Sequence, residues 1–458
     1  MTFGDKLNNG SDQYGPRIPR EATALMAALQ VRGSSDTLLH ELTDHDWSSL
    51  LGFCELAHLT LPLARVATNQ FPTWVADRLE TNAAYNALRF ERVKKTYREA
   101  ANALNGVGVD HVVIKGFSQV PDYVNEPRWR AQSDLDFFCP AEMIEPARVA
   151  LEAIGYKAEQ RSDYRRADHI PTLVRPGPWR WRGNHFDPEM PLSIELHFCL
   201  WNEAASMFSI PEVQDFWNRR TVRVVDGLYF PCLSKVDQLG YISLHIVRNL
   251  LSGEWIVHHV RELAVFLQNH AGDDAFWQAW TDIHDKSLRS IEAIAFYYAQ
   301  AWFGCELHKE VGQQIAKLLP VQQRWLRRFK WSALECMFYP RRDSIWLHMS
   351  FLQSGKVKRA LVKRHFFPVK VSSIDSPNVE VRNRRPVGKP GDSRYLRYCR
   401  FLIARCAHYS RFTMITLLRG LRWRMESRSF SMKVWMFLLA CFFLTSACLL
   451  TSSFSTYF

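Results

Sequence analysis

The ten cysteines of this 458-residue chain never form a Cys-x-x-Cys pair. Without that spacing neither a zinc knuckle nor a disulfide framework is indicated, so a reducing cytoplasm is the compartment that fits best. The motifs G-x-x-x-x-G-K-[ST], G-x-S-x-G and G-x-G-x-x-G are also missing from any useful context. Their absence argues against a P-loop enzyme, a lipase-like hydrolase and a dinucleotide-dependent oxidoreductase.

The chain also lacks an even distribution of charge. Its formal net charge is +12, but residues 356–433 hold 20 Lys and Arg against four acids, which is +16 and leaves −4 for the rest. The sequence pI near 9.2 suggests a protein that binds nucleic acid. Because the part before residue 356 is not basic, we expect salt-sensitive nucleic-acid binding to be absent from it.

A run without charge follows the basic stretch. Residues 434–450 are VWMFLLACFFLTSACLL, which at 17 residues is the short end of a membrane-spanning helix. The basic residues before it predict that this side stays in the cytoplasm and contacts anionic headgroups. No secretory signal is indicated by residues 1–15. We expect a membrane-associated protein with a cytoplasmic core and a C-terminal anchor; a buried helix over 434–450 is the alternative.

Hydrophobic periodicity predicts an α+β fold, in which a small mixed β-sheet core is flanked by N-terminal and C-terminal helical regions and followed by a C-terminal hydrophobic helix. Helices are expected over 21–30, 36–58, 74–104 and 142–154, and strands over 111–115, 135–139, 193–200 and 221–230. The expected parts are a helical region 1–104, an α/β core 105–232, a helical domain 233–352, a basic Pro/Ser-rich linker 353–393, a basic amphipathic segment 394–430 and an apolar tail 431–458.

Asp134 and Asp136 begin the second expected strand. Alternate side chains of a strand share a face, so both carboxylates point one way while Leu135 and Phe137 point into the core. Two adjacent carboxylates repel unless a cation lies between them, which makes the pair a candidate divalent-metal site. A solvated aspartate pair is the commoner interpretation of the motif alone.

Three further features favour the metal interpretation. Glu195 and His197 lie on one face of the strand over 193–200, where Glu195 can supply a third carboxylate. Lys115 and Gly116 end the first strand, so a backbone amide and a point charge can approach a phosphate there. Arg130 precedes the aspartates and is able to clamp phosphate oxygens.

In this order, Ile114-Lys115-Gly116, Arg130-x-x-Ser133-Asp134-Leu135-Asp136, a helix ending Gly155-Tyr156, and Glu195-Leu196-His197 resemble the uncharacterised nucleotidyltransferase family of the polymerase-beta-type superfamily. The resemblance covers roughly residues 80 to 270. It implies an enzyme that transfers a nucleoside monophosphate from a nucleoside triphosphate to an unidentified acceptor hydroxyl, with Mg²⁺ or Mn²⁺. A catalytically silent nucleotide-binding or scaffold protein is the alternative.

The resemblance also implies roles for residues. Asp134, Asp136 and Glu195 would be catalytic and bind the metal, and His197 would orient Glu195, touch the acceptor or be structural. The triphosphate would be bound by Lys115, Gly116, Ser118, Arg130 and Ser133. Lys115-Gly116 stands where the superfamily has a Gly-Ser turn, which is a departure from the pattern.

Other motifs are weaker evidence for a functional site. His245, His258 and His259 lack the H-E-x-x-H spacing of a metal site, so we expect helix-surface or core positions. The tryptophans at 179 and 181 suit base stacking or a loop packed over the sheet. Asp187 is a reserve third metal ligand.

Overall fold

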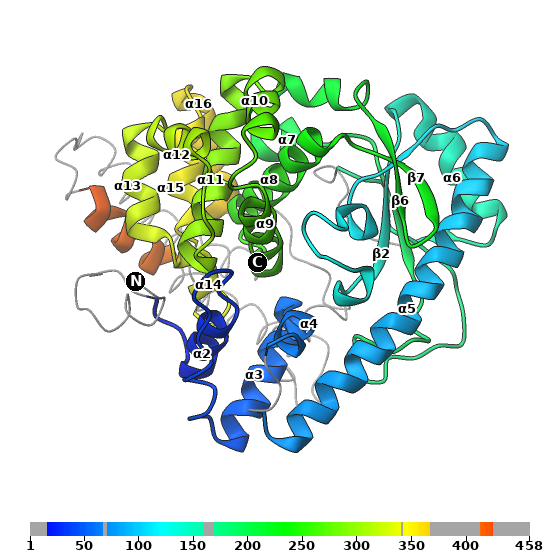
Figure 1. Cartoon of the computed structure of the whole chain (residues 1–458). Helices are drawn as coiled ribbons and strands as arrows, with labels where there is room; N and C mark the ends of the chain where they lie inside the picture. Colours follow the sequence, from blue (N-terminus) through cyan, green and yellow to red (C-terminus); the bar gives the residue numbers. More distant parts are fainter. Residues whose placement is uncertain (1–15, 67–70, 160–167, 340–341, 367–412, 425–458) are drawn as a thin grey trace, which may run out of the picture. The chain divides into compact units, whose positions relative to one another are not determined.

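A computed structural model describes residues 16–66, 71–159, 168–339, 342–366 and 413–424 (Figure 1). The chain divides into two compact units, Met1–Leu326 and Arg327–Phe458. The expected mixed α/β fold, a mixed sheet with helices on its flanks, is confirmed. The finer division at residues 104 and 232 stays a prediction.

The first unit contains one sheet of seven strands, in the order β3-β4-β5-β2-β1-β7-β6. Its centre pairs β2 with β5 and β1 with β7 in parallel, while the remaining neighbours are antiparallel. The strands are β1 (Val112–Val113), β2 (Asp134–Phe138), β3 (Lys157–Ala158), β4 (Leu173–Val174), β5 (Ser193–His197), β6 (Thr221–Val225) and β7 (Leu228–Cys232). The sequence analysis predicted no strand at β3 or β4, which have two residues each; β1 is equally short but lies in the β-branched run His111–Ile114.

One face of this sheet is covered by two helices, α5 (Thr73–Gly106) and α6 (Ile144–Ala153). Leu135 and Phe137 of β2, with Ile194 and Leu196 of β5, join their apolar side chains in one core cluster. The alternate residues of both strands therefore point away from this core, as expected from the pleat. The β6–β7 hairpin turns at Asp226-Gly227, both with positive φ, which suits a tight type I′ turn.

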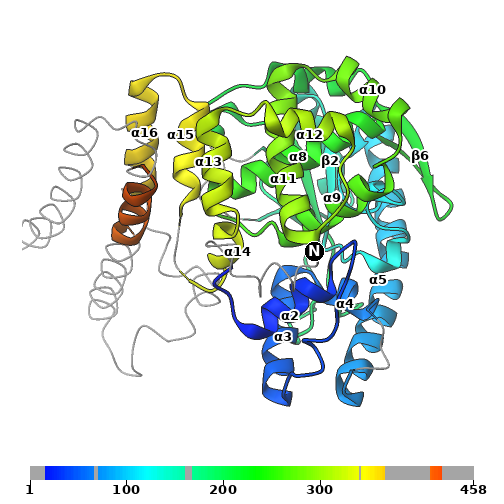
Figure 2. The same cartoon turned by 60° about the vertical axis from the view of Figure 1, so that its left-hand side comes forward.

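Most other helices of the first unit lie before or after the sheet residues in the chain, while the short α7 lies between β5 and β6. Helices α8, α9 and α11 pack against one another, and Figures 1 and 2 show them grouped together. The bounds are α2 (Arg20–Ala28), α3 (Asp44–Ala57), α4 (Thr60–Ala64), α7 (Glu203–Ser206), α8 (Lys235–Ser252), α9 (Val257–Asn269), α10 (Asp274–Ile283), α11 (Lys286–Phe303) and α12 (Lys309–Ala316), with 3-10 turns η2 (Gly116–Gln119), η3 (Pro127–Trp129), η4 (Ala141–Met143) and η5 (Pro211–Phe216). Helix α13 (Pro320–Phe329) follows.

Two expected boundaries are wrong. The helix expected over 36–58 begins only at Asp44, because Thr43 and Asp46 form a capping box that fixes the start there. The first part of the linker expected over 353–393 is helical instead, as α16 (Gly355–Phe366); residues 367–393 lie outside the described residues. The Lys, Arg, Ala and Leu of α16 are good helix formers, and the first proline of that stretch is Pro368.

The second unit contains α14 (Ser332–Glu335), α15 (Ser344–Phe351), α16 and a helix over 413–424. This last helix belongs to the expected basic amphipathic segment, and its Arg419 donates to Asp343 at 2.9 Å. Within the described residues, no helix is both long and apolar enough to cross a membrane. The expected span 434–450 lies outside the described residues.

A buried charge cluster joins three helices of the first unit. His284 is 1% exposed, with Nδ1 2.9 Å from Glu292 and Nε2 3.4 Å from Asp237. Arg219 donates two hydrogen bonds to the same aspartate. Burial alone would lower the pKa of His284, but the charges of Glu292 and Asp237 outweigh it and raise that pKa to about 9.

We predict that His284→Gln lowers the free energy of unfolding by about 3 kcal/mol near pH 6. The imidazolium is favoured in the folded protein, with a pKa of about 9 against 6.5 for an ordinary histidine. Its stabilisation is therefore complete below pH 6.5 and disappears as pH rises through 9. Denaturant unfolding at several pH values measures this difference. An equal deficit at pH 6 and pH 9.5 would contradict the assignment, and His40→Gln at an exposed position is the control.

Candidate functional site

Asp136 and Glu195 face each other on adjacent parallel strands. The register of β2 and β5 pairs these two residues directly and pairs Phe138 with His197. Both carboxylates and the imidazole therefore lie on the sheet face opposite the α5–α6 core. Asp136 is 2% exposed and His197 is 1% exposed, so any charge they carry must be matched within the protein.

Lys115 supplies one of the matching charges. It follows β1, and its Nζ lies 2.5 Å from Asp136 Oδ1 in a pair that is almost fully buried. Burial by itself would raise the pKa of the Asp136 carboxyl, but Lys115 and His197 outweigh it and hold that pKa well below its usual range. Asp136 is therefore an anion at neutral pH.

His197 lies between three carboxylates. Its Nε2 is 3.1 Å from Asp136 Oδ1 and 3.7 Å from Glu195 Oε2, while its Nδ1 is 3.5 Å from Asp168 Oδ2. Burial alone would lower the pKa of His197, but Asp136 and Glu195 outweigh this effect and raise it. One ligand atom each from Asp136, Glu195 and His197 lie within 4.8 Å of one another. Within the described chain this is the one such group of potential metal ligands.

Asp134 lies one alternation earlier on β2 and is not part of this group. Burial, and then the negative charge of Asp136, raises the pKa of Asp134 to about 7. A nearby cation would reverse this shift, because it favours the ionised carboxylate. The structure thus places Asp136 and Glu195 together as expected, adds His197 to them and leaves Asp134 beside them.

The donor set fits a divalent cation. Carboxylate oxygens are the protein ligands that Mg²⁺ and Mn²⁺ favour. Three carboxylates, those of Asp134, Asp136 and Glu195, lie near one lysine and one histidine. Burial and their mutual repulsion raise the pKa of Asp134 to about 7, and a divalent cation would relieve that repulsion. These residues would hold the ion, with His197 as a nitrogen donor or as an orienting partner of the carboxylates.

In the turn after Lys115, the backbone of Gly116 lies very close to the side chain of Gln132. Gly116 has φ +69°, and a Cβ there would collide with the side chain of Gln132. Gln132 accepts from Phe117 N at 3.2 Å and donates to Asp134 O at 2.7 Å, so it ties this turn to the start of β2. Glycine is therefore required for the spacing of Lys115 and the aspartates.

The other expected phosphate-binding residues are dispersed. Ser118 is fully buried; its hydroxyl donates to Lys115 O and accepts from Gln238. Arg130 pairs with Glu262 of α9 at 3.0 Å. Ser133 is exposed just before β2. Of the expected set, only Lys115 contacts the carboxylate group.

Sequence reasoning missed the polar partners of Glu195 and His197. Thr172 donates to Glu195 at 3.3 Å, and His169 Nε2 lies 3.9 Å from the same carboxylate. Asp168 is paired with Arg248 of α8. These partners come from a loop and a helix without motif spacing, so only the tertiary packing reveals them.

Two histidines of α8 and α9 continue the chain of polar contacts that begins with Asp168 and Arg248. Arg248 lies 2.9 Å from His245 Nδ1, and the Nε2 atoms of His245 and His259 are 3.1 Å apart. Burial lowers the pKa of both imidazoles well below the usual value, so both are neutral. Both side chains are buried, which agrees with a core position.

Tyr241 of α8 was not identified from the sequence. The Tyr241 hydroxyl is buried and has no hydrogen-bond partner among the described residues, while burial and the charge of Asp136 raise its pKa. Asp187, the reserve ligand, instead accepts from Trp179 at 3.0 Å and from Glu189 N at 2.8 Å, so Trp179 packs against this loop. Trp181 is exposed.

Comparison with known proteins gives one match. The family model described as uncharacterised nucleotidyltransferase matches residues 43–304, which include the whole sheet and helices α8 and α9. No curated protein and no solved structure matches the chain.

We predict that Lys115→Met lowers the free energy of unfolding by about 3 kcal/mol, because it leaves the buried Asp136 carboxylate without its cation. The double variant Lys115→Met/Asp136→Asn should recover part of this loss, since no charge is then stranded. Denaturant unfolding in the presence of a chelator measures all the variants. Strictly additive losses would show that the two side chains do not interact.

Proposed function

The chain belongs to the uncharacterised nucleotidyltransferase family, and we propose that it moves a nucleoside monophosphate from a nucleoside triphosphate to a hydroxyl group of an acceptor. The observation that supports this most is the direct pairing of Asp136 with Glu195 across β2 and β5. Carboxylates from two strands can hold a metal ion between them, which is what phosphoryl-group chemistry requires.

The proposed metal is Mg²⁺ or Mn²⁺, bound by Asp134, Asp136 and Glu195. A bound ion of this kind polarises phosphoryl oxygens and lowers the pKa of the acceptor hydroxyl. In the transfer, the acceptor oxygen forms a bond to the α-phosphorus while the bond to the β-phosphate oxygen breaks. The hydroxyl proton leaves to a carboxylate of the group, and pyrophosphate departs.

The side chains around the carboxylates have separate tasks in this proposal. His197 fixes Asp136 and Glu195 through its contacts at 3.1 and 3.7 Å. Lys115 holds Asp136 in place and offers positive charge to the triphosphate. Gly116 leaves room for the Gln132 side chain, which ties the turn after Lys115 to the start of β2.

A catalytically silent, nucleotide-binding scaffold is the second candidate. It is favoured by the inward-facing hydroxyl of Ser118 and by the pairing of Arg130 with Glu262, because neither group is then free to hold phosphates. The two candidates differ in one result. A silent protein binds nucleotide with metal but transfers no label to any acceptor.

We further propose that residues 434–450 anchor the protein to a membrane with its catalytic core on the cytoplasmic side. Support comes from the uncharged run and from the charge of +16 over residues 356–433. Positive charge before an apolar segment favours retention on the cytoplasmic side, and anionic headgroups attract it.

The activity test uses the full chain with α-labelled nucleoside triphosphates, Mg²⁺ or Mn²⁺, and an extract of cells that contain the acceptor. We expect metal-dependent label transfer that falls more than about 100-fold in Asp136→Asn and in Glu195→Gln, since losing even an outer partner of a metal site costs 10–100-fold. Glu145→Gln, on the exposed side of α6, is the matched control and should retain activity. Undiminished transfer in both site variants would reject the site.

The anchor is tested by deleting residues 434–458. The full chain should sediment with vesicles that contain anionic lipids, and the shortened chain should bind them weakly and lose that binding at high salt. Equal, salt-resistant sedimentation of both chains would contradict the anchor.

A further inference from the structure

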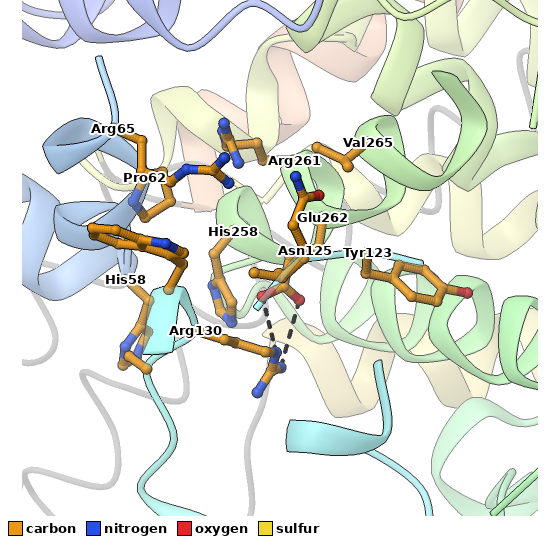
Figure 3. Close-up of a pocket in the computed structure, with 13 residues that line it drawn as sticks. His58, Pro62, Arg65, Tyr123, Asn125, Arg130, His258, Arg261, Glu262 and Val265 are labelled. Carbon is orange, nitrogen blue, oxygen red and sulfur yellow. Dashed lines mark hydrogen bonds and ion pairs between the residues drawn. The ribbon is translucent and has the colours of Figure 1, made fainter. Parts of the chain in front are cut away.

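A cavity lies away from the carboxylates, between α4, the segment before β2 and α9 (Figure 3). Its wall includes Arg65, Trp129, Arg130, His258, Arg261 and Glu262. None of its lining residues comes from β2 or β5, so it is separate from the strands that carry Asp136 and Glu195. The mechanism above uses no part of it.

The cavity carries unmatched positive charge. Of the lining residues that the structure describes, Glu262 is the one acid, and it is paired with Arg130 at 3.0 Å. Arg65 and Arg261 have no ion pair with any carboxylate in the described part of the chain. Figure 3 shows their guanidinium groups turned toward one another. Two facing cations repel, and an anion between them removes that repulsion.

The surroundings of Arg261 strengthen this argument. Its Nε is buried without a hydrogen-bond partner among the described residues. Burial, and then the charge of Arg65, lowers the pKa of Arg261 to about 10. A buried cation held beside a like charge is costly unless a ligand pairs with it. The unpaired Nδ1 of His258 lines the same cavity.

The dimensions and the aromatic wall limit the ligand. The cavity volume of about 60 Å³ has room for a few waters or one small group, but not for a nucleoside. The guanidinium of Arg65 lies 5.8 Å from the ring centre of Trp129, which restricts its position. Arginine forks match the planar or tetrahedral oxygens of carboxylates and phosphates.

We propose that this cavity binds a phosphate or carboxylate group of the acceptor, so that the acceptor is an anionic molecule with a free hydroxyl. This inference rests on the proposed transfer function. Arg130 joins the two places, because it lines the cavity and stands four residues before Asp134, in the segment that leads into β2. An acceptor held by Arg65 and Arg261 would extend along Arg130 toward the carboxylates.

The experiment measures thermal unfolding of the full chain with inorganic phosphate, pyrophosphate or acetate as probes. We expect the wild type to gain at least about 2 °C at saturating phosphate or acetate. Arg261→Met and Arg65→Met should lose most of this gain. Without the probe, Arg261→Met should be as stable as the wild type or more so, because the substitution removes a buried, unpaired cation. Arg128→Gln, which removes an exposed arginine paired with Glu126, should keep the gain.

The second arm identifies the source of the anion. The affinity of a non-hydrolysable nucleoside triphosphate with Mg²⁺ should change less than about twofold in Arg261→Met if the group belongs to the acceptor. A tenfold or larger loss would assign the cavity to the triphosphate and overturn the proposal, as would the absence of any probe-dependent gain in the wild type.

The two proposals fail in different ways. Asp136→Asn should abolish metal-dependent triphosphate binding and keep the gain with phosphate. If the wild type binds no triphosphate yet keeps that gain, the transfer function and the acceptor assignment both fall, and only an anion site remains. If triphosphate binds but the gain is absent, the cavity proposal alone fails.

Discussion

The arrangement of the first unit depends on the repulsion between Asp136 and Glu195. Parallel pairing of β2 and β5 places these acids side by side, and burial makes their separation from water costly. Lys115 and His197 supply the nearest compensation. Several features then follow from the need to keep Lys115 at 2.5 Å: the early end of β1, the glycine after it and the Gln132 side chain that ties that turn to β2.

The helices after the sheet also supply charge that stabilises the site. Asp168 contacts His197 on one side and Arg248 of α8 on the other. From there a chain of polar contacts passes through His245 and His259 of α8 and α9, and Glu262 follows at 3.9 Å. Because both imidazoles are neutral, they carry this contact without adding charge to the interior. The carboxylates and the arginine-lined cavity therefore share one polar interior.

The strand residues of the site could be predicted from the sequence, whereas their partners could not. Alternation along 134–137 and 194–198 shows which side chains share a face, and it assigned Asp136 and Glu195 to the polar face of their strands. Lys115 was identified by its position at the end of the first expected strand. The direct pairing of Asp136 with Glu195 comes from the register of β2 and β5. The pairing of Arg130 with Glu262 depends instead on how α9 packs, and Asp168 comes from a loop. Neither has a spacing that a motif can express.

The pairing of distant strands also determines when the site can come into existence during folding. His197 and Asp136 are separated by 61 positions in the chain, and the helix α6 lies between their strands. Contacts of this kind are made only after a long loop has closed, so they belong to the late, topology-limited part of folding. A chain emerging from the ribosome would thus acquire its local helices well before its carboxylates meet.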